Sequence, residues 1–215
     1  MSNLPQCAEC PNKLCDEEKY LPDKLPLFCP MRNMKDAISG SKDRYMRPLI
    51  KRLSRNSALV EKEGYLIWPR LRETIEFAKR MDVKKIGIAF CIGLAEETKR
   101  IVKILELNGF YVASVCCKVG SIDKSFIEIS DEDKLVRPFE AMCNPIAQAE
   151  ILNRVGTGLN IVVGLCVGHD SLFYMHSKAP VTTLITKDRV TGHNPVIVLF
   201  SSYHKDLPIP SKKSE

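Results

Sequence analysis

The chain has 215 residues, enough for one ordinary domain with a substantial core and a small appendage. Its 45% hydrophobic and 27% charged residues are typical of globular proteins and exclude a wholly disordered chain. The net charge of +6 is mild, and no basic stripe alternates with aromatic residues, so we expect no nucleic-acid partner. No stretch approaches the roughly 18 consecutive apolar residues of a membrane span, and the N-terminus lacks the apolar segment of a signal peptide. We therefore expect a cytoplasmic protein without a membrane partner.

Nine cysteines are many for a chain of this length. Their number is odd and the expected compartment is reducing, which disfavours a framework of disulfides. The cysteine content therefore favours metal binding by thiolates or redox chemistry.

The first cysteines form a group of their own in residues 1–34. Cys7, Cys10, Cys15 and Cys29 follow the spacing C-x2-C-x4-C-x13-C in a proline-rich segment with little apolar material. Four thiolates around one metal site would stabilise such a segment, because metal binding then contributes to folding. The spacing fits either zinc or an iron–sulfur cluster and does not decide between them.

Residues 35–83 are expected to form a helical segment that packs on a sheet. An irregular apolar stripe runs along residues 43–62, where Pro48 starts or kinks the helix and Gly64 ends it. Pro69 is suited to the start of a second helix.

From residue 84 the pattern changes to alternating strands and helices, and we expect an α/β domain over residues 84–206. Short apolar runs predict strands at 85–91, 110–117, 159–163 and 181–185, with a possible fifth at 195–200, and helical patterns separate them. This order predicts a Rossmann-like, mostly parallel sheet of four to five strands with flanking helices. Residues 118–142 form an unusually long polar connection, and residues 207–215 a flexible tail.

Cysteines recur where the predicted strands end. Cys91 ends the first strand, Cys116 and Cys117 end the second, and Cys166 follows the third. Parallel strands bring their carboxyl ends to one edge of the sheet, so these thiols are expected to meet there. Cys143 precedes a helix that would join them, and a helix N-terminus favours the thiolate. The sequence leaves open whether Cys116 or Cys117 is the ligand, and single buried cysteines often serve only as small hydrophobic residues.

Two further candidates follow Cys166. His169 is placed by the C-x2-H spacing to bind metal or to act as an acid–base group, and Asp170 could orient it. The alternative for Asp170 is an N-cap of the helix that begins at Ser171. His193 lies in a turn that could return to the same edge.

These cysteine contexts carry a resemblance that spans nearly the whole chain. Cys7-x2-Cys10, Ile-Ala-Phe-Cys91-Ile-Gly-Leu, Val-Cys116-Cys117-Lys, Cys143-Asn-Pro-Ile-Ala-Gln-Ala-Glu and Gly-Leu-Cys166-Val-Gly-His-Asp resemble the uncharacterised cysteine-rich "metal-binding protein" family of anaerobic bacteria and archaea, a domain of unknown function. The resemblance implies metal binding and an anaerobic setting that suits oxygen-sensitive clusters, and it implies no reaction.

Three hypotheses follow. The first is a cytoplasmic redox protein whose α/β domain holds an iron–sulfur cluster, of the 4Fe–4S type, through Cys91, Cys117 or Cys116, Cys143 and Cys166, with a second cluster or zinc on the N-terminal cysteines. The second is a cysteine-nucleophile enzyme with His169 as base and a structural zinc. The third is a non-catalytic metal sensor or carrier. A redox partner protein or a small-molecule substrate fits these hypotheses, and the sequence fixes neither the oligomeric state nor whether the protein is an enzyme.

Overall fold

The structure is a computed structural model that describes residues 4–136 and 138–200. The chain divides into two compact units between Glu63 and Gly64. The segment boundaries expected from the sequence, after residues 34 and 83, stay predictions.

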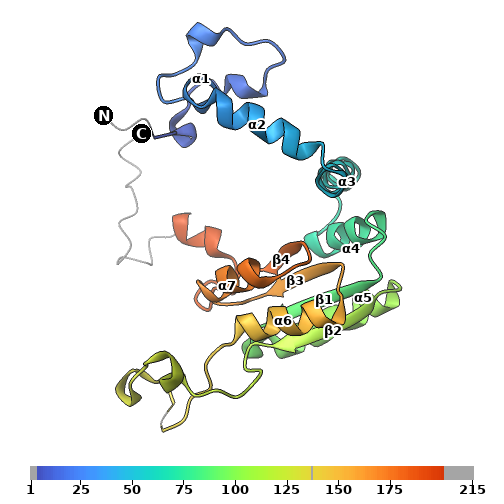
Figure 1. Ribbon diagram of the computed structural model, residues 1–215, viewed down its shortest axis with the longest axis vertical. Helices are drawn as coiled ribbons and strands as arrows, with labels where there is room; N and C mark the ends of the chain where they lie inside the picture. Colours follow the sequence, from blue (N-terminus) through green and yellow to red (C-terminus); the bar gives the residue numbers. More distant parts are fainter. Residues whose placement is uncertain (1–3, 137, 201–215) are drawn as a thin grey trace. The chain divides into compact units, whose positions relative to one another are not determined.

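The first unit is built from short turns and helices (Figure 1). Three single 3-10 turns, Cys7–Glu9, Leu14–Asp16 and Pro22–Lys24, precede helices α1 (Pro30–Asn33), α2 (Lys35–Tyr45) and α3 (Pro48–Gly64). Pro48 starts α3, as its missing N–H and fixed φ allow. Few side chains are fully buried here, Leu25 and Val60 among them.

The second unit contains a four-stranded parallel sheet with the order β2-β1-β3-β4. Its strands are β1 (Lys85–Phe90), β2 (Tyr111–Cys116), β3 (Leu159–Val163) and β4 (Val181–Ile185). The parallel α/β architecture predicted from the sequence is confirmed, and β3 and β4 have the predicted bounds.

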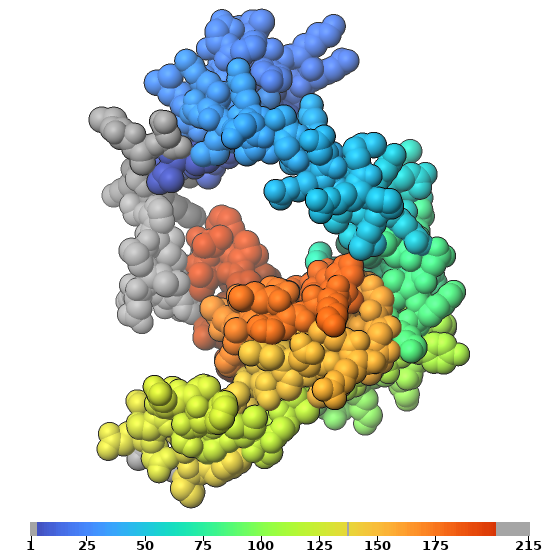
Figure 2. Space-filling view, viewed as in Figure 1, coloured from blue at the N-terminus to red at the C-terminus, as the bar shows by residue number. Residues whose placement is uncertain are grey.

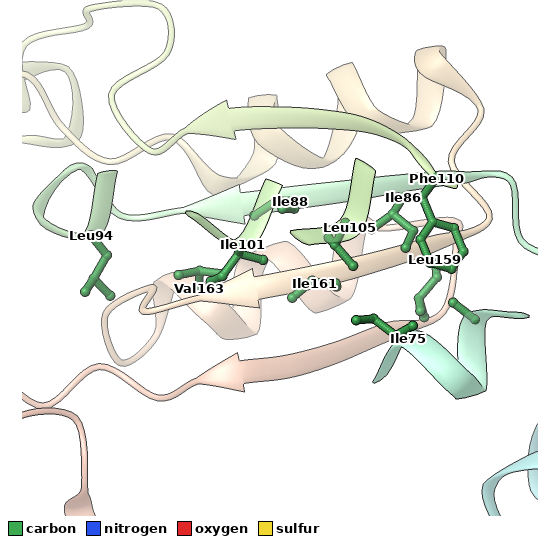
Figure 3. Packing of buried hydrophobic residues seen from close by; sticks show 11 residues of the cluster. Ile75, Ile86, Ile88, Leu94, Ile101, Leu105, Phe110, Leu159, Ile161 and Val163 are labelled. Carbon is green, nitrogen blue, oxygen red and sulfur yellow. The ribbon is translucent and has the colours of Figure 1, made fainter. Parts of the chain in front are cut away.

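Helices cover both faces of this sheet (Figure 1). They are α4 (Arg70–Arg80), α5 (Ala95–Leu107), α6 (Pro145–Val155) and α7 (His169–His176), and a 3-10 turn, η4 (Ile92–Leu94), precedes α5. Residues of α4 and α5 pack with Ile86, Ile88 and Ile161 into one apolar cluster, shown in Figure 3. Residues of α6 and α7 pack with Ala89 and Val162 into a second cluster. Successive side chains of a strand point to opposite faces, which explains why neighbouring residues serve different clusters.

The possible fifth strand at residues 195–200 is wrong. Pro195–Phe200 forms a 3-10 helix, η7, that begins with a turn in which Ile197 N–H donates to Asn194 O. Pro195 offers no N–H to a neighbouring strand, and the apolar side chains of this segment are largely exposed. An apolar run of this length is compatible with strand or helix, and here the proline selects the helix. The predicted tail at 207–215 lies outside the described residues.

The long connection 118–142 is an ordered excursion from the sheet, and Figure 2 shows its yellow-green atoms standing out from the helices that cover the sheet. A short antiparallel bridge between Asp123 and Ala141 closes it. Inside it, the buried ammonium of Lys134 contacts the carboxylates of Asp123 and Asp131, both at 2.7 Å, and Pro138 O at 2.9 Å. These contacts make it a structured loop in the residues described.

Gly164, the residue after β3, lies where the strand ends are closely packed. Gly164 has a φ of +62°, and a Cβ there would overlap Cδ1 of the buried Leu94 side chain. Gly156 has a φ of +71° with no atom within 4 Å of a Cβ. We expect Gly156→Ala to cost about 1–2 kcal/mol from backbone strain alone.

Gly164→Ala should cost a further ~1–3 kcal/mol from overpacking, measured by urea unfolding. Equal losses of unfolding free energy in the two variants would contradict the close contact with Leu94.

Candidate cysteine site

Four cysteines of the second unit lie at the carboxyl edge of the sheet. Cys91 directly follows β1, Cys117 follows β2, Cys166 lies between β3 and α7, and Cys143 lies just before Asn144, the N-cap of α6. Backbone hydrogen bonds hold three of these segments side by side. Cys91 N–H donates to Val163 O (3.1 Å), Cys117 N–H to Phe90 O (2.8 Å) and Asn144 N–H to Cys117 O (2.7 Å).

The structure distinguishes between the two adjacent cysteines that the sequence left open. Cys117 is 1% exposed, and its Sγ accepts a hydrogen bond from Ile92 N–H at 3.4 Å. Its thiol also shares hydrogen bonds with Cys91 and Cys143. Cys116, the last residue of β2, is half-buried and packs against the second apolar cluster. Cys117 is therefore the member that belongs to the site.

Cys117 is the central thiol of this group, and its two neighbours have acidic thiols. The hydrogen bond from Cys117 lowers the pKa of Cys143 to about 4, with help from the His169 ring. The same central thiol lowers the pKa of Cys91 to about 5, with smaller contributions from Gly93 N–H and Lys187. Hydrogen bonding to Cys143 and Cys91, together with burial, raises the pKa of Cys117 well above its usual range. These contacts thus favour a protonated Cys117 between two more acidic thiols.

Cationic side chains surround the thiols. The Lys187 ammonium hydrogen-bonds Cys91, and Arg189 Nη2 donates to Cys166 Sγ at 3.2 Å. Cys166 is the largest cause of a raised Arg189 pKa. Lys118, the residue after Cys117, acts electrostatically on Cys143.

His169 lies beside the thiol of Cys143, and the metal-ligand or acid–base role expected from its C-x2-H spacing stays a prediction. It is the first residue of α7, and its hydrogen bond to the Cys143 thiolate raises the pKa of the imidazole. Its Nδ1 is buried and has no hydrogen-bond partner in the part of the chain that the structure describes. Asp170 is not the N-cap, because Gly168 takes that position. Its carboxylate accepts from Ser171 N–H at 2.8 Å and acts on His169 as a minor electrostatic influence.

Comparison with known proteins places the chain in a family. Residues 29–184 match the family described as "Protein of unknown function (DUF1847)". The chain belongs to the DUF1847 family. It is also 45% identical over 199 residues to the uncharacterized protein MJ0455 of Methanocaldococcus jannaschii, covering 93% of this chain and 95% of that protein. No solved structure matches the chain. The DUF1847 match begins at Cys29 and includes Cys91, Cys117, Cys143 and Cys166.

The four N-terminal cysteines are not gathered in the same way. Cys7 and Cys15 are exposed in separate 3-10 turns, Cys10 Sγ donates to Asn12 Oδ1 at 3.5 Å, and Cys29 is the N-cap of α1. Three of them precede the residues that match DUF1847. The metal module predicted for residues 1–34 stays a prediction.

Within residues 4–136 and 138–200, no group of three or more His, Cys, Asp or Glu side chains is arranged to hold a metal ion. The sulfur donors at the sheet edge are of the type that binds both iron–sulfur clusters and zinc.

Sequence reasoning missed two of the site's cations. Lys118 and Lys187 are each the second residue after a strand, β2 and β4, where side chains of parallel strands reach the edge. Arg189 lies two residues further along, and its guanidinium donates to Cys166 Sγ. His193 supports the same turn through its Nδ1, which accepts from Asp188 N–H at 3.1 Å. Their position shortly after a strand, rather than their residue type, could have identified these two lysines from the sequence.

The thiol pKa values predict an order of reactivity in metal-free, reduced protein. At about pH 6, Cys143 should react with iodoacetamide as a thiolate and Cys117 should not, because its proton is retained. His169→Gln removes a partner of the thiolate, so the pKa of Cys143 should rise and its alkylation at about pH 4 should slow several-fold.

Peptide mass spectrometry would give the rate at each cysteine. His176→Gln, at the other end of α7, is the matched control and should leave the rates unchanged. Reaction of Cys117 as fast as Cys143 would show that the central proton is misassigned.

Proposed function

We propose that the chain is a redox protein whose cysteine site holds an iron–sulfur cluster of the 4Fe–4S type. The observation that carries this proposal is the placement of four cysteines from four separate segments at one edge of the sheet. Cys117 hydrogen-bonds Cys91 and Cys143, and Arg189, which donates to Cys166, links that thiol to the same group. Four cysteine thiolates are the usual ligand set of such clusters. Structural packing needs no such placement, because buried cysteines serve as small apolar residues one at a time.

The charges around the thiols support the same proposal. A cluster with four thiolates carries net negative charge, and Lys118, Lys187 and Arg189 lie beside the thiols that would bind it. Hydrogen bonds to sulfur and nearby charge are among the factors that set the reduction potential of a cluster. When bound, the group would supply one-electron transfer. The protein's own residues would hold its sulfur ligands, neutralise their charge and keep Cys117 and Cys91 away from solvent.

The remaining parts of the proposal follow from the sequence. Cys7, Cys10, Cys15 and Cys29 would hold a second cluster or zinc, in a cytoplasmic protein of anaerobic cells. Its electron partner would be a redox protein or a small molecule. In the part of the chain that the structure describes, no helix has the length and apolar character needed to cross a membrane.

Anaerobic purification followed by iron, sulfide and zinc analysis tests the proposal. We expect about four irons and four sulfides per chain at the sheet edge. Cys117→Ser should remove them, whereas Cys116→Ser should keep them, because Cys116 lies outside the thiol group. A colourless wild-type protein without iron would rule out the cluster, and equal iron in the two variants would rule out this ligand set.

A second candidate function rests on the pair of Cys143 and His169. The imidazole contacts the Cys143 thiolate, and each raises the charged fraction of the other. A thiolate beside an imidazolium, near a helix N-terminus, is typical of nucleophilic cysteines. In this candidate the Cys143 thiolate attacks an acyl carbon and forms a thioester, the bond to the leaving oxygen breaks, and the His169 imidazolium gives its proton to that oxygen. Zinc on the N-terminal cysteines is then only structural.

A burst experiment separates the two candidates. A nucleophilic Cys143 should release about one equivalent of nitrophenol from p-nitrophenyl acetate in a rapid first phase, owing to acylation of the thiol. Cys143→Ser should abolish that phase, and Cys116→Ser should retain it. Wild-type protein that contains iron and shows no burst would leave the cluster as the function, and a burst unaffected by Cys143→Ser would exclude this nucleophile.

A further inference from the structure

The order of the strands marks one position on the carboxyl edge of the sheet. From the central strand β1 the chain proceeds to β2 on one side, and β3 lies on the other side. Helix α5, which follows β1, packs in the apolar cluster on one face of the sheet. Helix α7, which follows β3, packs in the cluster on the opposite face. Ligands of open parallel sheets bind outside the strand ends at such a switch point. In this chain the switch point lies beside Cys91, Gly93 and Gly164.

The Lys187 side chain reaches this position along two glycines. A Cβ on Gly93 would lie 3.7 Å from Lys187 Nζ, and a Cβ on Gly164 would lie 3.6 Å from Lys187 Cε. The same ammonium hydrogen-bonds Cys91. Gly93 therefore places no side chain against the Lys187 ammonium, whereas the position beside Gly164 is filled by Leu94.

Arg189 supplies a second cation from the same segment. Its Nη2 donates to Cys166 Sγ, so the guanidinium faces the thiol that follows β3. The nearby carboxylates are engaged in turns. Asp188 Oδ1 accepts from Val190 N–H at 3.0 Å and from Thr191 N–H at 3.1 Å. The positive charges after β4 are therefore directed toward the strand ends.

We infer that the switch point between β1 and β3 binds a small oxyanion, the carboxylate or phosphoryl group of a substrate, through Lys187 and Arg189. A guanidinium offers two parallel N–H donors to such a group, and an ammonium beside it adds a point charge. The bound anion lies next to Cys91 and Cys166, so a substrate held there reaches the thiol site. The inference goes beyond the proposed function, because it depends on the cations and not on what the thiols hold.

Calorimetric titration of the purified full chain with inorganic phosphate and, separately, with succinate tests the inference and distinguishes the two chemistries. Wild-type protein should bind at least one probe. Lys187→Met and Arg189→Met should each weaken binding roughly tenfold or more, because each removes a charged hydrogen-bond partner. Lys187→Arg and Arg189→Lys should restore part of the affinity, which a general loss of structure would not allow.

The controls are Lys103→Met on α5 and Arg154→Met on α6, two exposed cations away from the carboxyl edge. They should bind like wild type. The inference is overturned if neither probe binds at about 10 mM, or if Lys187→Met and Arg189→Met bind like the controls.

Iron analysis of the same samples keeps the two conclusions separate. Iron-free protein that binds the probes refutes the cluster alone, and iron-containing protein that binds neither refutes the anion site alone.

Discussion

The parallel register of the central strand is the constraint on which the site depends. Phe90, the last residue of β1, pairs with Cys116 on one side and with Val163 on the other. The residues that follow these three positions must therefore leave the sheet side by side. One pairing register thus delivers Cys91, Cys117 and Gly164 to the same edge. A shift by one residue would also exchange the two faces of a strand, which the apolar clusters on both faces forbid.

A buried amide fixes the remaining cysteine to that register. Gln148 of α6 is fully buried, and its Nε2 donates to Val115 O at 2.6 Å and to Phe90 O at 3.2 Å. These carbonyls lie at the ends of β2 and β1, so the amide joins α6 to both strands. Asn144 strengthens the same junction, since its N–H donates to Cys117 O and its side chain caps α6. Cys143 directly precedes Asn144, so the same contacts hold it next to Cys117.

Much of this arrangement was predictable, for a physical reason. The apolar runs and the glycines between them predict the strands β1 to β4. Parallel pairing then requires that the carboxyl ends of these strands lie at the same edge of the sheet. Cys91, Cys166 and the adjacent pair Cys116 and Cys117 follow from those two steps. Less predictable were the features that depend on three-dimensional contacts rather than on spacing. The selection of Cys117 over Cys116 depends on its contacts with Ile92, Cys91 and Cys143, and the role of Lys187 depends on Gly93, which places no side chain against its ammonium. The strand predicted at residues 195–200 was wrong because an apolar run does not reveal whether a neighbouring strand is available to pair with it.

The connection 118–142 has a further consequence for how the family can vary. Its two ends are already joined by the hydrogen bond between Asn144 N–H and Cys117 O and by the bridge between Asp123 and Ala141. The entropy of closing a flexible loop grows slowly, by about 0.6 kcal/mol for each doubling of its length. Added residues beyond the bridge would therefore cost little closure entropy and leave the thiols in place, as long as the contacts of Lys134 are kept. The excursion could thus gain new surface without a change at the cysteine site.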